Sequence, residues 1–177
     1  MDSTTAIAKV KKHLAGRHPR RILFVCLGNI CRSTAAEGIL RDIVERRGEA
    51  ADWVIDSAGT SGYNDGKGPD QRMIVHARRR GVELTHISRR VRMSDFDNFD
   101  LIVGMDDNNI RNLRQMAPTL EDEDKIVPMA AFVNKAMRYD YIPDPYYDGA
   151  EGFELVLDLL EDGCARLADE ADAMPRA

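Results

Sequence analysis

Four short apolar runs alternate with longer segments of helical periodicity along the chain. The runs cover residues 22–25, 53–55, 101–103 and 126–127, and unbroken apolar runs are typical of strands buried on both faces. Strands that alternate with helices predict right-handed crossovers and a parallel sheet covered on both sides. We therefore expect an α/β fold, a single-domain three-layer sandwich in which a four-stranded parallel sheet lies between helices.

The helical segments are marked by their ends as well as by their apolar stripes. The first has Thr34 and Glu37 at the spacing of a capping box and ends at Gly48. Two more helices are predicted over 70–81 and 106–117. A C-terminal helix is indicated by apolar residues on one stripe, namely Phe153, Val156, Leu157, Leu160, Cys164 and Leu167.

Charge is unevenly distributed between the two ends of the chain. The net charge is −5, which argues against a general nucleic-acid surface. Residues 1–21 hold six basic side chains and one acidic, whereas residues 151–177 hold eight acidic and two basic. We interpret the ends as mutually attractive solvated segments, with a partner-binding arm as the alternative. The acidic run 121–124 is interpreted as a solvated loop.

The length and the composition favour one domain with short extensions. A chain of 177 residues that is 44% hydrophobic can bury a single sizeable core. We expect a basic, helical N-terminal extension over 1–20, a domain over 21–172 and a C-terminal tail over 173–177. The apolar residues of the extension, Ile7, Val10 and Leu14, have helical spacing, which fits either packing on the domain or recruitment of a partner.

The three cysteines, Cys26, Cys31 and Cys164, are an odd number without a disulfide framework, which suits a reducing compartment. The sequence contains no long uncharged apolar stretch, and its start lacks the apolar region of a signal peptide. We therefore expect no membrane span and a cytoplasmic location. The cysteines and histidines show no zinc-ligand spacing, so we expect neither a metal nor a cofactor. Surface positions are expected for His13, His18 and His76, and a core position for Cys164.

The segment Cys26-Leu27-Gly28-Asn29-Ile30-Cys31-Arg32-Ser33 lies between the first strand and the first helix. Successive N–H groups at a helix N-terminus bind oxyanions and stabilise a thiolate, so we expect Cys26 to be ionised at neutral pH. Arg32 can grip two phosphate oxygens in a planar fork, and Ser33 can donate its hydroxyl to the sulfur. The loop is thus predicted to cradle a phosphate beside a nucleophile.

Other polar residues follow neighbouring strands. Cys26 ends the first strand, Ser57 ends the second, and Asp106 follows the third. Ligands of open parallel sheets bind outside the carboxyl ends of the strands, so these side chains are predicted to meet at one site. Asp106 suits a helix cap as well as an active-site support.

The octapeptide resembles the signature loop of the low-molecular-weight protein tyrosine phosphatases. Further agreement lies in Pro143-Asp144-Pro145-Tyr146-Tyr147-Asp148-Gly149, in Asp56-Ser57-Ala58-Gly59-Thr60, and in His86 and Met105-Asp106. The resemblance implies a Rossmann-like phosphotyrosine phosphatase I fold. It also implies metal-free hydrolysis of phosphotyrosine and small aryl phosphates through a phosphocysteine, with inorganic phosphate as product. The partners implied are phosphotyrosine proteins or peptides, with a tyrosine kinase as the opposing enzyme.

The resemblance also assigns roles to single residues. Cys26 would be the nucleophile and Arg32 the phosphate clamp. Asp144 would be the general acid, held between two prolines, with Asp148 as the runner-up. The phosphate would be bound by the loop residues Leu27, Gly28, Asn29, Ile30, Cys31, Arg32 and Ser33.

Supporting roles fall to residues around the loop. Asn29 is expected in a left-handed conformation and, by the resemblance, in a polar network with Ser33, Ser57 and His86. Cys31 would be a redox partner that forms a disulfide with Cys26, or only a packed residue. Aromatic walls for the substrate are expected from Tyr63, Tyr146 and Tyr147.

Other functions fit the sequence less well. Arsenate reductases of the same fold relay through two mid-chain cysteines, and no cysteine lies between Cys31 and Cys164. The similar bacterial protein arginine phosphatases typically have threonine where Ile30 stands. A non-catalytic phosphotyrosine-binding module would have lost the thiol or the acid, and both Cys26 and Asp144 are present.

Overall fold

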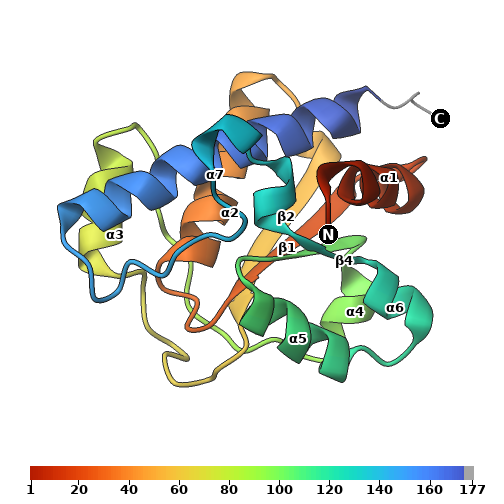
Figure 1. The fold of residues 1–177 in the computed structure, drawn as a ribbon, viewed down its shortest axis with the longest axis horizontal. Coiled ribbons are helices and arrows are strands. Elements are labelled where there is room, and N and C mark those ends of the chain that lie inside the picture. Colours follow the sequence, from red (N-terminus) through yellow and green to blue (C-terminus); the bar gives the residue numbers. More distant parts are fainter. Residues whose placement is uncertain (174–177) are drawn as a thin grey trace.

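Four parallel strands form the centre of the molecule (Figure 1). A computed structural model describes residues 1–173, and their strands lie in the order β2 (Trp53–Gly59), β1 (Arg20–Cys26), β3 (Leu101–Gly104) and β4 (Ile126–Pro128). All three strand pairs are parallel, which confirms the predicted sheet. The tail expected over 173–177 lies, from residue 174 onward, outside the described residues.

Helices cover both faces of the sheet, as predicted. One face carries α1 (Ser3–Leu14), α2 (Arg32–Arg46) and α7 (Ala150–Asp172), with α3 (Gln71–Arg78) packed on α7, and the other carries α4 (Asp95–Asn98), α5 (Asp107–Met116) and α6 (Leu120–Asp124) (Figure 1). Short 3-10 turns complete the fold: η1 (Ala50–Asp52), η2 (Met129–Phe132) and η3 (Lys135–Met137).

The residues of β1 alternate between two cores. Ile22 and Phe24 are fully buried against the α2 and α7 side, whereas Leu23 and Val25 are fully buried against the α4 and α5 side. This alternation follows from the two-residue period of a strand. Because β1 is central and buried on both faces, its carboxyl end is held rigidly, and Cys26 is its last residue.

The N-terminal helix α1 packs into the same core as the rest of the chain. Val10 and Leu14 are buried against the cluster that includes α7 and η2. Arg20 pairs with Asp172 at 3.1 Å, but Lys12 pairs with Asp124 of α6 at 2.8 Å. The basic N-terminal segment therefore forms ion pairs both with the acidic C-terminal helix α7 and with α6. The prediction of a solvated loop over 121–124 is wrong, because these residues belong to helix α6, which is capped by Thr119.

Two further sequence expectations are corrected. The capping box of Thr34 and Glu37 does not form, because α2 begins at Arg32 with Cys31 at its N-cap position and no side-chain cap bond. Glu37 is buried and bonds to residues of other elements instead. His13 and His76 are buried rather than at the surface, since each fits against a carboxylate, Asp124 and Glu154 respectively.

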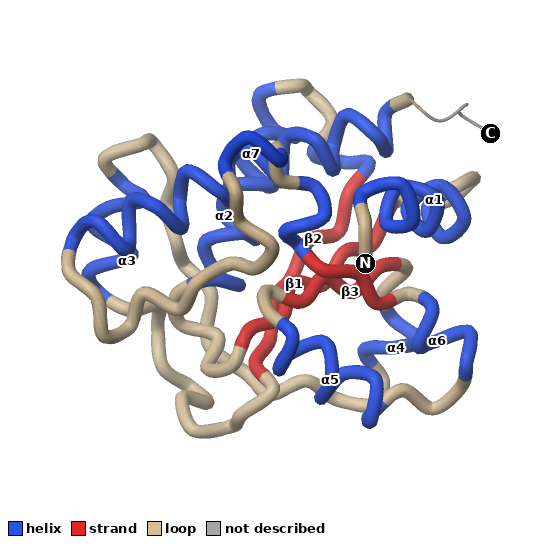
Figure 2. Tube along the Cα trace, in the orientation of Figure 1, coloured by secondary structure: helices blue, strands red, loops and turns tan. Residues whose placement is uncertain are grey.

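The sheet order places a topological switch point beside β1. The chain leaves β1 for β2 on one side and later returns to β3 on the other, which opens a crevice at the carboxyl ends of the strands. Loops gather at this end of the strands (Figure 2). Among the described residues, no helix is long and apolar enough to cross a membrane.

Candidate active site

Cys26 is the last residue of β1, and its sulfur lies beside the loop that joins β1 to α2. The residue is only 3% exposed, and its Sγ lies 3.0 Å from the Ser33 hydroxyl and 3.3 Å from the backbone N of Asn29, which donates to it. No side chain caps the N-terminus of α2. The loop thus surrounds the sulfur with hydrogen-bond donors beside the positive end of a helix dipole.

Asn29 sets the shape of this loop. It has the predicted left-handed conformation, with a φ of 56°, and its side-chain Nδ2 donates to Ser33 Oγ at 2.8 Å and to Ser57 Oγ at 3.0 Å. Because Ser33 already accepts from Asn29, its own hydroxyl hydrogen is free to point at the Cys26 sulfur. The backbone of Asn29 therefore contacts the Cys26 sulfur directly, and its side chain acts on that sulfur through Ser33.

A buried carboxylate fixes the direction of these hydrogen bonds. Ser57 Oγ donates to Glu37 Oε1 at 2.9 Å, and His86 Nδ1 lies 3.0 Å from the same oxygen. Burial alone would raise the pKa of Glu37, but His86, Arg41 and Ser57 outweigh it and lower that pKa. Glu37 accordingly stays an acceptor at neutral pH, so Ser57 must donate to it and accept from Asn29.

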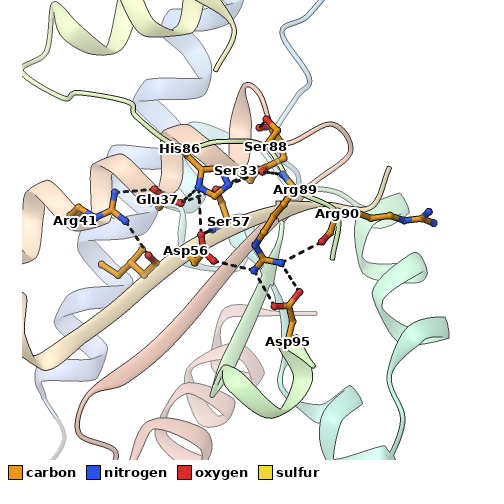
Figure 3. A network of polar contacts seen from close by, with 12 residues as sticks. Ser33, Glu37, Arg41, Asp56, Ser57, His86, Ser88, Arg89, Arg90 and Asp95 are labelled. Carbon is orange, nitrogen blue, oxygen red and sulfur yellow. Dashed lines mark hydrogen bonds and ion pairs between the residues drawn. The ribbon is translucent and has the colours of Figure 1, made fainter. Parts of the chain in front are cut away.

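The network continues to Arg89, whose side chain points toward Asp56 and Asp95 (Figure 3). His86 Nε2 lies 2.9 Å from Asn29 Oδ1, which also accepts from the backbone N of Arg89 at 3.1 Å. The Arg89 side chain makes two 3.0 Å bonds to Asp95 and one to Asp56. With both amide ends engaged, the Asn29 side chain has one orientation only.

Within residues 1–173, Glu37, Asp56 and His86 form a group whose possible ligand atoms all lie within 4.8 Å of one another, as a metal ion would need. These atoms are already hydrogen-bonded to one another, to Ser57 and to arginines. They fit a polar network better than a metal centre. The expectation of a metal-free enzyme stays a prediction.

Arg32 lies deep in the site and is held by acceptors at its far side. Its Nη1 donates to Asp106 Oδ2 at 2.7 Å and to the Ile142 carbonyl at 3.0 Å, while Nη2 lies 3.6 Å from Asp144 Oδ2. Burial by itself disfavours the charge, but the Cys26 sulfur and the two carboxylates outweigh it and raise the pKa of Arg32. Asp106 both caps α5, through the N–H of Asn109, and orients this guanidinium.

Asp144 lines the same cleft as Cys26 and lies on the irregular segment between η3 and α7. Its side chain is 45% exposed, and its Oδ1 accepts from the backbone N of Tyr146. The cleft has a volume of about 510 Å³. The predicted residues among its lining are Cys26, Leu27, Gly28, Ile30, Cys31, Arg32, Tyr63, Asp144, Tyr146 and Tyr147. Asp148 is not part of this lining.

Cys31 is buried at the N-cap position of α2 and faces the same cleft as Cys26. Burial, with help from the charge of Asp70, raises the pKa of its thiol far above the usual range. Cys31 therefore stays protonated at neutral pH, in contrast to what is expected of a nucleophile. Cys164 is fully buried in the core, as predicted.

A sequence model of the low molecular weight phosphotyrosine protein phosphatases matches residues 21–175. The chain belongs to this family. The phosphatase of this name from Schizosaccharomyces pombe is 39% identical over 134 residues, which cover 75% of this chain and 85% of that protein. A crystal structure of protein tyrosine phosphatase from Entamoeba histolytica is 40% identical with a TM-score of 0.83, over 86% of this chain and 97% of that one. The family match begins after α1, and the family's members are hydrolases.

One further solved structure bears on substrate choice. The structure named DARP, drosophila arginine phosphatase, is 33% identical with a TM-score of 0.79 and covers 86% of this chain and 98% of its own. The fold of this phosphatase family is therefore similar in proteins whose names refer to different phosphorylated residues.

Sequence reasoning missed three residues around the site. Glu37 was predicted to be part of a capping box, although a carboxylate among the apolar residues of a buried helix face signals a polar partner. Arg89 carried no signal, because its partners Asp56 and Asp95 come from distant parts of the chain. Asn64 donates to the Gly28 carbonyl at 3.3 Å and lines the cleft.

Proposed function

We propose that this phosphatase hydrolyses phosphotyrosine in proteins or peptides, and small aryl phosphates, through a phosphocysteine on Cys26. The observation that carries the proposal is the convergence of Cys26, Arg32 and Asp144 on one cleft. These three side chains supply a nucleophile, a clamp for phosphate oxygens and a proton donor in one cleft. No cofactor or metal enters the proposed reaction.

In the first step, the Cys26 sulfur attacks phosphorus in line with the phenolic oxygen. The S–P bond forms as the P–O bond breaks, and the protonated Asp144 carboxyl gives its proton to the departing phenolate. The loop N–H groups and Arg32 stabilise the charge on the equatorial oxygens. Preorganised donors of this kind are usually the largest contribution to catalysis.

In the second step, the Asp144 carboxylate takes a proton from a water molecule whose oxygen attacks the phosphocysteine. The S–P bond breaks, inorganic phosphate leaves, and the sulfur returns as a thiolate. Ser33 supports the sulfur in both steps, because its hydroxyl lies 3.0 Å away and can donate to the negative charge. Asp144 thereby returns to its protonated form for the next cycle.

The preference for an aryl ester rests on the depth of the sulfur and the walls around it. Cys26 is buried, whereas the lining residues Tyr63 and Tyr147 are strongly exposed and Tyr146 is intermediate between them and the cysteine in exposure. A phenyl ring can bridge this depth and contact aromatic walls. A phosphoserine side chain is too short to place its phosphorus against the sulfur.

Protein arginine phosphatase activity is the second candidate, because the drosophila arginine phosphatase has a similar fold. A guanidinium is also flat and could enter the cleft. Ile30, at the position where bacterial arginine phosphatases typically have threonine, lines the cleft and makes it more apolar. An apolar wall favours a phenyl ring over a charged, strongly hydrogen-bonding group.

We further propose that the reaction takes place in the cytoplasm, opposite a tyrosine kinase. A nucleophilic thiol must stay reduced, and the three cysteines of the chain are all free. A phosphotyrosine phosphatase acts only where a kinase has supplied its substrate. The reaction thus requires an enzyme that transfers phosphate to tyrosine, which is a tyrosine kinase.

The deciding experiment compares otherwise identical peptides carrying phosphotyrosine, phosphoserine or phosphoarginine. Release of phosphate is measured for the wild type, for Cys26→Ser and for Cys164→Ala, a matched control for a cysteine far from the cleft. We expect turnover of phosphotyrosine only, lost in Cys26→Ser, kept in Cys164→Ala and unaffected by excess chelator. Faster turnover of phosphoarginine, or activity that needs a metal, would overturn the proposal.

A further inference from the structure

Asp144 lies on a segment without helix or strand, so other contacts must fix its position. Before Asp144, the backbone N of Ile142 donates to the Met105 carbonyl at 2.9 Å. After it, the Tyr146 carbonyl accepts a 3.0 Å hydrogen bond from Arg72 Nη2. Arg72 is thus the side chain that ties the segment down on the side of Tyr146.

Arg72 lies in the first turn of α3, where it is held on several sides. Its guanidinium makes a two-point contact with Asp70, at 3.1 Å from Nε and 2.9 Å from Nη2. It also lies over the rings of Tyr146 and Phe153, with its Cζ 5.4 and 4.7 Å from their centroids. Phe153 is buried in the core, so the guanidinium rests on a rigid surface.

The other end of this arrangement reaches the phosphate loop. The backbone N of Asp70 donates to the Ile30 carbonyl at 2.9 Å. On the acid side, the backbone N of Tyr146 donates to Asp144 Oδ1 at 3.1 Å. Direct contacts therefore lead from Ile30 in the nucleophile loop, through Asp70, Arg72 and Tyr146, to the carboxylate of Asp144.

We propose that Arg72 is a positioning residue that holds the Asp144 carboxyl at the correct distance from the phosphate loop. The proposal rests on the proposed function of Asp144 as proton donor. Arg72 does not line the cleft, and it acts through Tyr146. A proton donor must reach its acceptor within a hydrogen-bond distance, and small displacements of a catalytic group are costly.

An arginine suits this position for two reasons. Its planar group can face Asp70 with Nε–H and one N–H of Nη2 and use the second hydrogen of Nη2 toward the Tyr146 carbonyl, which a lysine cannot reproduce. Its charge is matched by Asp70, so the tether adds no net charge beside the general acid. The Arg72 side chain is 46% exposed, which makes it open to substitution without a cavity in the core.

The proposal predicts a loss that depends on the leaving group. Arg72→Ala should lower kcat/KM for a phosphotyrosine peptide about tenfold, equivalent to about 1.4 kcal/mol of transition-state stabilisation. For an aryl phosphate with a strongly acidic phenol, which needs little protonation, the loss should be less than about twofold. Arg72→Lys should lie between Arg72→Ala and the wild type.

Arg78→Ala is the matched control. Arg78 is the last residue of the same helix and pairs with Glu83 at the surface. Its removal should leave the activity toward both substrates unchanged. Thermal melting of all variants shows whether the protein remains folded, and if Arg72→Ala is not folded, Arg72→Lys carries the comparison.

The sharpest test combines Arg72→Ala with Asp144→Asn. If Arg72 acts through the acid, its removal should cost nothing further on phosphotyrosine once the acid is absent, because the two changes remove one function. Full additivity of the two losses, or an equal loss on both substrates, would overturn the proposal. If Asp144→Asn itself shows no dependence on the leaving group, the proposed function fails instead.

Discussion

Arg32, which lines the cleft, donates a 2.7 Å hydrogen bond to Asp106. This contact joins the end of the phosphate loop to the N-terminus of α5, elements that follow two neighbouring strands. Because Nη1 is bound to Asp106 and to the Ile142 carbonyl, the orientation of the guanidinium plane is set before a substrate arrives. We propose that its other nitrogens, Nε and Nη2, bind the phosphate oxygens of the substrate.

Replacement of Arg32 by lysine should therefore be severe. An ammonium keeps the charge but can neither reach Asp106 in the same plane nor bind two phosphate oxygens. We expect kcat/KM on phosphotyrosine to fall roughly 10²–10³-fold, as when a transition-state donor is lost. Arg46→Lys, at the exposed end of the same helix, is the control. Near-normal kinetics of Arg32→Lys would rule out the clamp.

The general acid can be identified by its dependence on the leaving group. Asp144→Asn should reduce kcat/KM on phosphotyrosine roughly 10²–10⁴-fold, but far less on an aryl phosphate with a strongly acidic phenol. Asp148→Asn should have little effect, because Asp148 does not line the cleft. A larger effect from Asp148→Asn would assign the acid to that residue, and equal losses on both substrates would reject Asp144.

Cys31 should protect the enzyme from irreversible oxidation. Peroxide converts the Cys26 thiolate to a sulfenic acid, and the Cys31 thiol can then condense with it to a disulfide and water. Both cysteines line one cleft and lie on one short loop. We expect a thiol reductant to restore most of the activity of peroxide-treated wild type but little of that of Cys31→Ser. Equal recovery would show that Cys31 only packs.

The ion pair between Lys12 of α1 and Asp124 of α6 should make the free energy of unfolding fall as the pH is lowered into the acidic range. The hydrogen bond from Lys12, with help from His13 and Lys9, lowers the pKa of Asp124 to about 2, well below the ordinary value of an aspartate. A lowered pKa gives stability that is present above the unfolded value and is lost as the pH falls through the folded value.

Asp124→Asn should accordingly lower Tm at neutral pH by up to about 4 °C, since exposed ion pairs contribute about 0.2–1 kcal/mol. The difference from wild type should shrink as the pH falls from about 4 to about 2. Glu123→Gln on the same helix, with only a distant pair to Arg114, is the control. A Tm difference independent of pH would contradict this account.

The sheet and the phosphate loop could be predicted from the sequence because their signals are local. The apolar runs that became β1 and β3 are unbroken, and a strand end followed by a helix start brings Cys26, Arg32 and Ser33 together over only eight residues. Asp106 could be placed as well, since parallel strands bring their carboxyl ends to one edge.

Contacts between distant segments could not be predicted in the same way. Glu37 has the spacing of a capping residue, yet the helix starts earlier and the carboxylate turns to His86, 49 positions along the chain. His13 gives no sequence signal of burial, because its partner Asp124 lies on α6. The Arg72 contact with Tyr146 joins residues 74 positions apart. Contacts between side chains so far apart in the sequence form only when the helices pack on the sheet.

The central claim is that Cys26 carries the phosphoryl group during turnover. The most direct measurement is rapid alkaline quenching of the enzyme during turnover of a phosphotyrosine peptide, because an S–P bond is hydrolysed in acid, followed by peptide mass spectrometry without acidification. We predict one added phosphoryl group on the peptide that contains Cys26, in the wild type and in Cys164→Ala, and none in Cys26→Ser. A phosphoryl group on another residue, or turnover that persists in Cys26→Ser, would contradict the account.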